Sequence, residues 1–189
     1  PAPRDVLVAR VGAVLEAADG DELLSGDWGR LVVVGPARAS PADASENDGC
    51  LALALETPHG TVLLPGDREE DGVADLLAAH PDLAADVLVS PHHGLPAPSR
   101  ERLRAAVRPR VEVASAPAAV AATLPPTAWV TGRDGAVTLT LGPGGPVVSA
   151  FASRRPADLA TTEPGSADAR PARPRPYDPT RPAMPDVPT

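Results

Sequence analysis

Two short stretches of the sequence place possible metal ligands directly after apolar strands. "TVLLPGD" ends in Asp67, and "ADVLVSPHHG" contains the adjacent histidines His92 and His93. A carboxylate oxygen together with a neutral imidazole nitrogen suits zinc or manganese. Each motif also has a plainer interpretation: Asp67 could cap a helix that opens at Arg68, and the histidines could be hydrogen-bonded loop residues.

The segment between the two motifs makes a shared site more plausible. It reads as one helix, "REEDGVADLLAAH", so a right-handed β-α-β crossover would bring both strand ends to one edge of the sheet. Side chains alternate along an extended backbone, so we expect one histidine to face the site and the other to support it. His59 and His80 are predicted to be surface residues. A catalytic zinc needs three protein ligands and a two-metal site needs more, so these motifs supply only half a site.

The elements that must position these residues follow from apolar spacing and turn signals. The pattern predicts helices over 5–18, 68–80 and 99–108, the last capped by Ser99. Two hairpins are expected early in the chain: "DELLSGDWGRLVVVG" around a Gly-Asp turn, and "CLALALE" with "TVLLPGD" around residues 57–60. A third is expected from "TAWVTG" and "AVTLTLG" around an Arg-Asp-Gly turn. Further strands are "ADVLVS", "RVEVAS" and "PVVSAF". Interleaved strands and helices predict a layered α/β (α+β) fold.

Composition divides the chain into a domain over residues 1–151 and a Pro/Arg-rich tail over 152–189. The apolar pattern stops in the tail while Pro recurs, which predicts disorder. Every basic residue of the chain is Arg, and the net charge of −8 argues against simple binding to a duplex backbone. It leaves room for a metal-assisted hydrolase, whose cation supplies positive charge locally. Arg100, Arg104 and Arg108 share a helix face, which we interpret as solvated rather than phosphate-binding.

Other sequence features exclude several classes of protein. Cys50 is the only cysteine, which excludes an internal disulfide and a thiolate zinc cluster. No apolar run approaches the roughly 18 residues of a membrane span, and no signal peptide is visible. The start at Pro1 rather than Met suggests a fragment or a processed piece.

Residues 31–141 resemble the C-terminal metallo-β-lactamase-like domain of bacterial ComEC competence proteins, which take up DNA at the membrane. The matching pieces are "END", "TVLLPGD", "ADVLVSPHHG", "LRAAVRPRVEVAS" and "TGRDGAVTLTL", in family order. The resemblance implies the second half of an αββα sandwich with a zinc or manganese centre that hydrolyses phosphodiester bonds in DNA. In that scheme Asp67 is a bridging carboxylate and catalytic residue. His93 is the preferred ligand, and His92 is the fallback ligand or a supporting residue.

The resemblance also implies what lies outside this chain. The family's His-x-His-x-Asp-His motif would precede Pro1, so the two-metal site would be complete only with upstream residues. Pro65, Cys50 and Leu95 replace the usual Thr, Ser and Ser, and the family's Gly-His-Pro loop has no counterpart. The parent is expected in the cytoplasmic membrane with this domain outside, while the fragment itself would be soluble.

The expected partners of the parent protein are a single DNA strand, the upstream half-domain and the membrane region, with no nucleotide cofactor. Alone, the chain is expected to bind metal weakly and to show no nuclease activity. Two alternatives remain open. One is a non-catalytic structural or interaction remnant of the same fold, and the other is a different hydrolase of that fold, such as a phosphorylcholine esterase.

Overall fold

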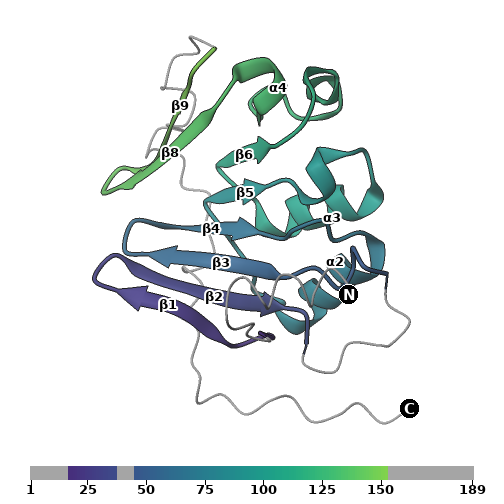
Figure 1. The fold of residues 1–189 in the computed structure, drawn as a ribbon, viewed down its shortest axis with the longest axis vertical. Coiled ribbons are helices and arrows are strands. Elements are labelled where there is room, and N and C mark those ends of the chain that lie inside the picture. The colour runs from purple at the N-terminus through teal and green to yellow at the C-terminus, as the bar shows by residue number, and fades with distance from the viewer. Residues whose placement is uncertain (1–16, 38–44, 153–189) are drawn as a thin grey trace, which may run out of the picture.

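A seven-stranded mixed sheet dominates the computed structural model, which describes residues 17–37 and 45–152 (Figure 1). The strands lie across the sheet in chain order: β1 (Glu22–Gly26), β2 (Gly29–Gly35), β3 (Ala52–Thr57), β4 (Gly60–Leu64), β5 (Val87–Val89), β6 (Val111–Ala114) and β7 (Trp129–Val130). Strands β1 to β4 pair antiparallel, and β4 to β7 pair parallel. Both early hairpins form as predicted, and the mixed α/β class is confirmed.

Helices make the crossovers that parallel strands require. They are α2 (Glu70–Ala79), η1 (Pro91–Gly94), α3 (Pro98–Val107) and η2 (Ala118–Thr123). A further short helix, α4 (Thr131–Asp134), follows β7 and leads out of this sheet. The helix expected over residues 5–18 lies almost wholly outside the described residues, as does nearly all of the Pro-rich tail. Among the residues that the structure describes, no helix is long and apolar enough to cross a membrane.

Alternation of side chains along the strands gives the sheet two apolar faces. Leu63 and Leu88 point to the face covered by α2 and α3. The neighbouring Val62 and Val87 point to the opposite face. That second face packs against a separate two-stranded sheet of β8 (Val137–Gly142) and β9 (Gly145–Ala150). The rim where β4 and β5 end therefore sits on a sheet that is packed from both sides.

Two local predictions are wrong. "TAWVTG" and "AVTLTLG" do not form a hairpin, because residues 131–134 form α4, β7 joins the large sheet and β8 pairs with β9. The buried Asp134 carboxylate accepts the Val130 N–H at 2.8 Å and closes this turn against β7. Ser99 does not cap α3 either. Pro98 occupies the first turn, where its fixed φ favours a helix start, and no side chain caps it.

Candidate metal centre

The two motifs meet at one edge of the sheet. Strand β4 pairs parallel with β5, with Leu63 opposite Leu88, so both strands end on the same side. The loops that follow them also touch, because the His92 backbone N–H donates to the Gly66 carbonyl at 3.2 Å. The crossover thus brings Asp67 and the paired histidines to a common rim.

His93 turns one ring nitrogen toward Asp67. Its Nε2 lies 3.7 Å from Asp67 Oδ1, and its Nδ1 lies 2.9 Å from the Ser115 carbonyl. A carbonyl oxygen only accepts, so Nδ1 carries the proton and the Nε2 lone pair of the neutral ring faces the carboxylate. At 3.7 Å the two atoms are too far apart for a direct hydrogen bond. A carboxylate oxygen and a neutral imidazole nitrogen are donor types with which Asp67 and His93 would hold zinc or manganese.

His92 has a different partner from its neighbour. Its Nδ1 lies 2.8 Å from Glu69 Oε1, and the same oxygen lies 3.0 Å from Asn47 Nδ2. The two imidazole centroids are 6.4 Å apart, with the ring planes inclined at 61°. Glu69, at the start of α2, therefore joins the loop of Asn47 to His92, whereas His93 faces Asp67.

The backbone of the histidine pair is not extended, so that expectation is wrong. His92 (φ 45°, ψ 51°) and His93 (φ 56°, ψ 18°) both lie in the left-handed region, and Gly94 follows with φ 74°. A left-handed conformation costs a residue with a side chain about 1–2 kcal/mol. Such strain persists only where the surroundings fix it, and it clusters at functional sites. The expected separation of roles is nevertheless present, since the two rings have different partners.

Two arginines of α3 anchor this strained loop. The prediction of a solvated face is wrong for Arg100, which is buried, whereas Arg104 is partly exposed and Arg108 is exposed as predicted. Arg100 is 4% exposed and donates to the Gly94 carbonyl at 2.6 Å and to the Thr123 carbonyl at 2.7 Å. Arg104 contacts the buried Glu112 at 3.1 Å, and Glu112 accepts the Ser90 hydroxyl at 2.7 Å. The loop over 91–94 is therefore held at both ends. Apolar periodicity could not show this, because a buried Arg and an exposed Arg look alike in sequence.

Asp67 does not cap α2, which leaves its carboxylate at the rim. The orphan N–H groups of Glu69 and Gly72 donate instead to Asp48 Oδ1, at 2.9 and 2.8 Å. Burial raises the pKa of Asp48, but hydrogen bonds from Gly72, Ser45 and Glu69 and the charge of Arg68 outweigh it and hold that pKa below its usual range. The N-cap rule considers only residues next to the start of a helix. It therefore cannot identify Asp48, which lies 21 residues before Glu69 in the sequence.

Residues on either side of Asp67 fix its turn. Gly66 adopts φ 67°, and a Cβ there would lie 3.1 Å from the Cys50 Cβ, so glycine is required. Arg68 is 2% exposed and donates to the carbonyls of Cys50 at 3.0 Å and Gly72 at 2.8 Å. Burial lowers the pKa of the Arg68 guanidinium, while neighbouring acidic groups oppose that shift. Arg68 thus points inward while Asp67 remains 43% exposed.

The described residues supply only part of a metal site. No group of three or more His, Cys, Asp or Glu side chains within 17–37 and 45–152 is placed to hold one ion. His80 Nε2 contacts Asp19 at 3.0 Å, at the far end of α2, and His59 is exposed in the β3–β4 turn. The donor pair of Asp67 and His93 suits zinc or manganese in chemistry and spacing. A third ligand would have to come from elsewhere.

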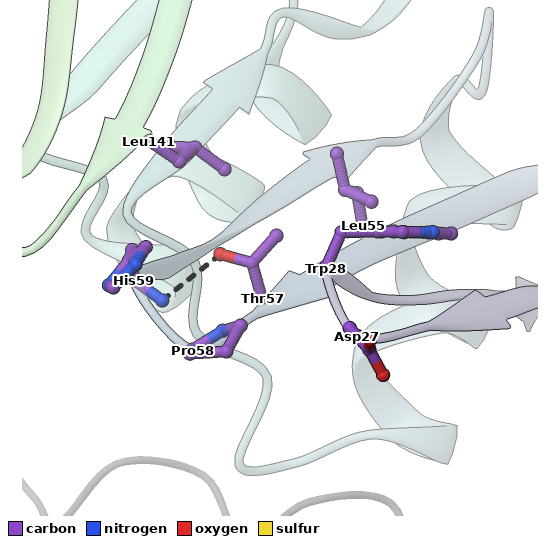
Figure 2. A pocket seen from close by; sticks show the side chains of 7 residues that line it. All are labelled: Asp27, Trp28, Leu55, Thr57, Pro58, His59 and Leu141. Carbon is purple, nitrogen blue, oxygen red and sulfur yellow. Dashed lines mark hydrogen bonds between the residues drawn. The ribbon is translucent and has the colours of Figure 1, made fainter.

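A hollow at the opposite end of the strands is separate from this rim. Figure 2 shows its lining of Trp28, Leu55, Leu141 and neighbouring turn residues, around a volume of about 330 Å³. Pro58 and His59 belong to the turn that begins β4, whereas Asp67 follows the end of that strand. The lining is mostly apolar, and its polar side chains are Asp27, Thr57 and His59.

Comparison with known proteins connects part of this chain to competence proteins. No protein-family model matches the chain, and no solved structure matches it. Over 104 residues the chain is 32% identical to the ComE operon protein 3 of Bacillus subtilis (strain 168). The aligned region covers 55% of this chain but only 13% of that protein's length. Part of the chain is thus related to a ComEC-family protein.

Proposed function

We propose that the chain is the C-terminal part of a metal-dependent hydrolase domain. Its parent would be a ComEC-like DNA-uptake protein that hydrolyses phosphodiester bonds in DNA. One observation carries the proposal: His93 Nε2, with its tautomer set by the Ser115 carbonyl, faces Asp67 Oδ1 at 3.7 Å where two parallel strands end. Partial similarity to the ComE operon protein 3 supports the choice of parent.

In this proposal Asp67 and His93 are ligands at the rim, and His92 is a supporting residue or an additional ligand through Nε2. A zinc or manganese ion bound there lowers the pKa of coordinated water and neutralises charge that builds on a phosphate. The residues of this chain hold the donors in place. Ser115 fixes the proton on His93 Nδ1, while Gly66 and Arg68 fix the turn that presents Asp67.

The remaining ligands and partners would belong to the parent. An upstream half-domain would supply the missing histidines and complete the site, with a single DNA strand as substrate outside the cytoplasmic membrane. The β8–β9 sheet supports such packing, because both of its edges lack a further described strand and offer backbone groups with which an upstream strand would pair. A cation held at the rim would supply locally the positive charge that the chain, with a net charge of −8, lacks overall.

One observation favours a second candidate, a non-catalytic module that keeps the fold. Among the described residues, no group of three or more His, Cys, Asp or Glu side chains is placed to hold one ion. The fold would then serve as a structural or interaction unit, and Asp67 would have no ligand role.

Calorimetric titration with zinc and with manganese tests the proposal. We expect weak binding by the chain, weakened at least about tenfold in Asp67→Ala and in His93→Ala because each removes one of few donors. The matched controls are Asp82→Ala and His59→Ala, which remove exposed groups of the same types away from the rim. They should bind as the unaltered chain does. The chain should not cleave single-stranded DNA.

Two results would contradict the assignment. Tight binding that Asp67→Ala leaves unchanged would place the metal site elsewhere. Absence of any binding that depends on Asp67 or His93 would favour the non-catalytic module. Circular dichroism of each variant checks that it is folded.

A further inference from the structure

We propose that Glu69 and Asn47 are positioning residues for His92. Together they hold the imidazole with its proton on Nδ1, so that Nε2 stays free as a donor at the rim. The role of this free nitrogen as a ligand rests on the proposed function, but the positioning itself is a property of the metal-free chain.

The contact between Glu69 and His92 defines the tautomer. Glu69 Oε1 lies 2.8 Å from His92 Nδ1, the length of a charge-assisted hydrogen bond. An ionised carboxylate only accepts, so the proton of this contact resides on Nδ1. His93 has the same arrangement with the Ser115 carbonyl at 2.9 Å. Histidines that bind metals through one nitrogen almost always donate the other N–H to a carboxylate or a carbonyl.

Asn47 selects the orientation of the Glu69 carboxylate. Its Nδ2 donates at 3.0 Å to the oxygen that also accepts from His92. An amide nitrogen is only a donor, so the contact keeps this oxygen between the two side chains. Glu69 would otherwise be free to rotate, because its side chain is 42% exposed.

The next residue of the same loop fixes the backbone of Glu69. Asp48 Oδ1 accepts the Glu69 N–H at 2.9 Å, and Asp48 Oδ2 accepts the Ser45 hydroxyl at 2.8 Å. Asn47 and Asp48 thus hold the side chain and the main chain of Glu69 from one short loop. The "END" tripeptide, which lies about 20 residues before Asp67, is thereby joined physically to the rim.

The strained backbone of His92 makes such positioning necessary. With φ 45° and ψ 51° the residue needs outside contacts to stay in place, and its N–H donates to the Gly66 carbonyl at 3.2 Å. The ring contact with Glu69 adds a second restraint from the same connection between β4 and α2. Together, these contacts determine where Nε2 points.

Long-range ¹H–¹⁵N NMR spectra of the metal-free chain, at a pH where the ring is neutral, measure the tautomer directly. We expect His92, identified by loss of its signals in His92→Gln, to carry its proton mainly on Nδ1. Glu69→Ala should shift it toward the Nε2–H form usual for exposed histidine, and Asn47→Ala should do so in part. Glu69→Gln should preserve the Nδ1–H form, because the amide oxygen can accept from both neighbours.

Zinc titration of the same variants supplies the second readout. We expect affinity to fall about tenfold or more in Glu69→Ala and to be largely kept in Glu69→Gln. The control is Glu46→Ala, which removes an exposed carboxylate next to Asn47 and should change neither readout. Circular dichroism confirms folding of each variant.

The outcomes separate this inference from the proposed function. A His92 proton on Nε2, or a tautomer that Glu69→Ala does not change, would overturn the positioning role. Loss of zinc in Glu69→Gln as severe as in Glu69→Ala, with the tautomer intact, would also overturn it by making Glu69 a ligand. The expected tautomer changes without any zinc binding would support the positioning and count against the metal site alone.

Discussion

At the scale of single residues, the candidate site is defined by which ring nitrogens of the two histidines already make hydrogen bonds. Both histidines use Nδ1 in contacts with acceptors, Glu69 for His92 and the Ser115 carbonyl for His93. Both therefore have Nε2 as the nitrogen left for other chemistry. His92 and His93 are successive non-glycine residues with left-handed backbone, a conformation that costs free energy. The contacts that anchor the loop offset this cost. This combination of strain and oriented donors is typical of a site rather than of a passive turn.

Asp48 should make stability depend on pH. Because its pKa in the folded chain lies below the ordinary aspartate value of 3.8, its stabilising contribution is present above that pH and is lost as pH falls through the folded pKa. We expect Asp48→Asn to be less stable than the unaltered chain at about pH 6, with the gap in unfolding free energy narrowing below about pH 4. Urea unfolding at a series of pH values measures the gap. Asp82→Asn is the control, and a gap for Asp48→Asn that stays constant with pH would contradict the argument.

The candidate ligands could be predicted from sequence, but the residues around them could not. Asp67 and the histidines stand out because they directly follow apolar strands separated by one helix. The Asn47 side chain donates a hydrogen bond to Glu69, which lies 22 positions later in the sequence. Rules that consider only neighbouring residues cannot predict such a contact. The left-handed histidine pair was also missed, since φ > 0 is expected at glycine rather than at histidine.

At the scale of elements, α3 works as a clamp on the histidine loop. Arg100 reaches the Gly94 carbonyl at the end of that loop, and Arg104 reaches Ser90 at its start through Glu112. A buried arginine is costly unless its guanidinium has partners. For Arg100 the partners include the Gly94 carbonyl of the strained loop, so burial of Arg100 and order of the loop depend on each other.

The end of α3 gives a prediction that is independent of function. Arg108 is exposed and adopts φ 49° and ψ 57° at the C-terminal end of the helix, where glycine is favoured. We expect Arg108→Gly to raise the unfolding free energy by about 1 kcal/mol through relief of the left-handed strain. Arg108→Ala keeps the Cβ and should leave stability nearly unchanged. Urea unfolding measures both, and equal stabilities of the two variants would refute the strain.

The strands were easier to predict from sequence than their pairing. Apolar runs and turn signals located all nine strands of the described chain, although every residue of β1 is exposed. The hairpin expected around residues 133–135 was wrong, since the decisive contact is the buried carboxylate of Asp134 on the Val130 N–H. Nothing in the run Arg-Asp-Gly distinguishes a hairpin turn from a short helix.

At the scale of the whole molecule, the sheet has two chemically different ends. The carboxyl ends of β4 and β5 hold the acidic and imidazole groups of the rim, while the turns at the opposite end form the apolar hollow of Figure 2. This agrees with the general placement of ligand sites at the carboxyl ends of parallel strands. The sheet between the two ends is rigid only if both faces stay covered. Its second face depends on the small β8–β9 sheet (Figure 1).

Two adjacent valines of β9 test whether that small sheet belongs to the same core. Val148 is 1% exposed against the large sheet, whereas Val147 is 50% exposed on the other side. Both changes to Ala remove the same atoms and the same strand preference, so the difference between them isolates burial. We expect Val148→Ala to lower the unfolding free energy by about 2 kcal/mol more than Val147→Ala. Urea unfolding followed by circular dichroism should show one transition for each variant. Equal stabilities, or a separate early transition in Val148→Ala, would mean that β8 and β9 pack independently, and the sheet that carries Asp67 and the histidines would then lack its second cover.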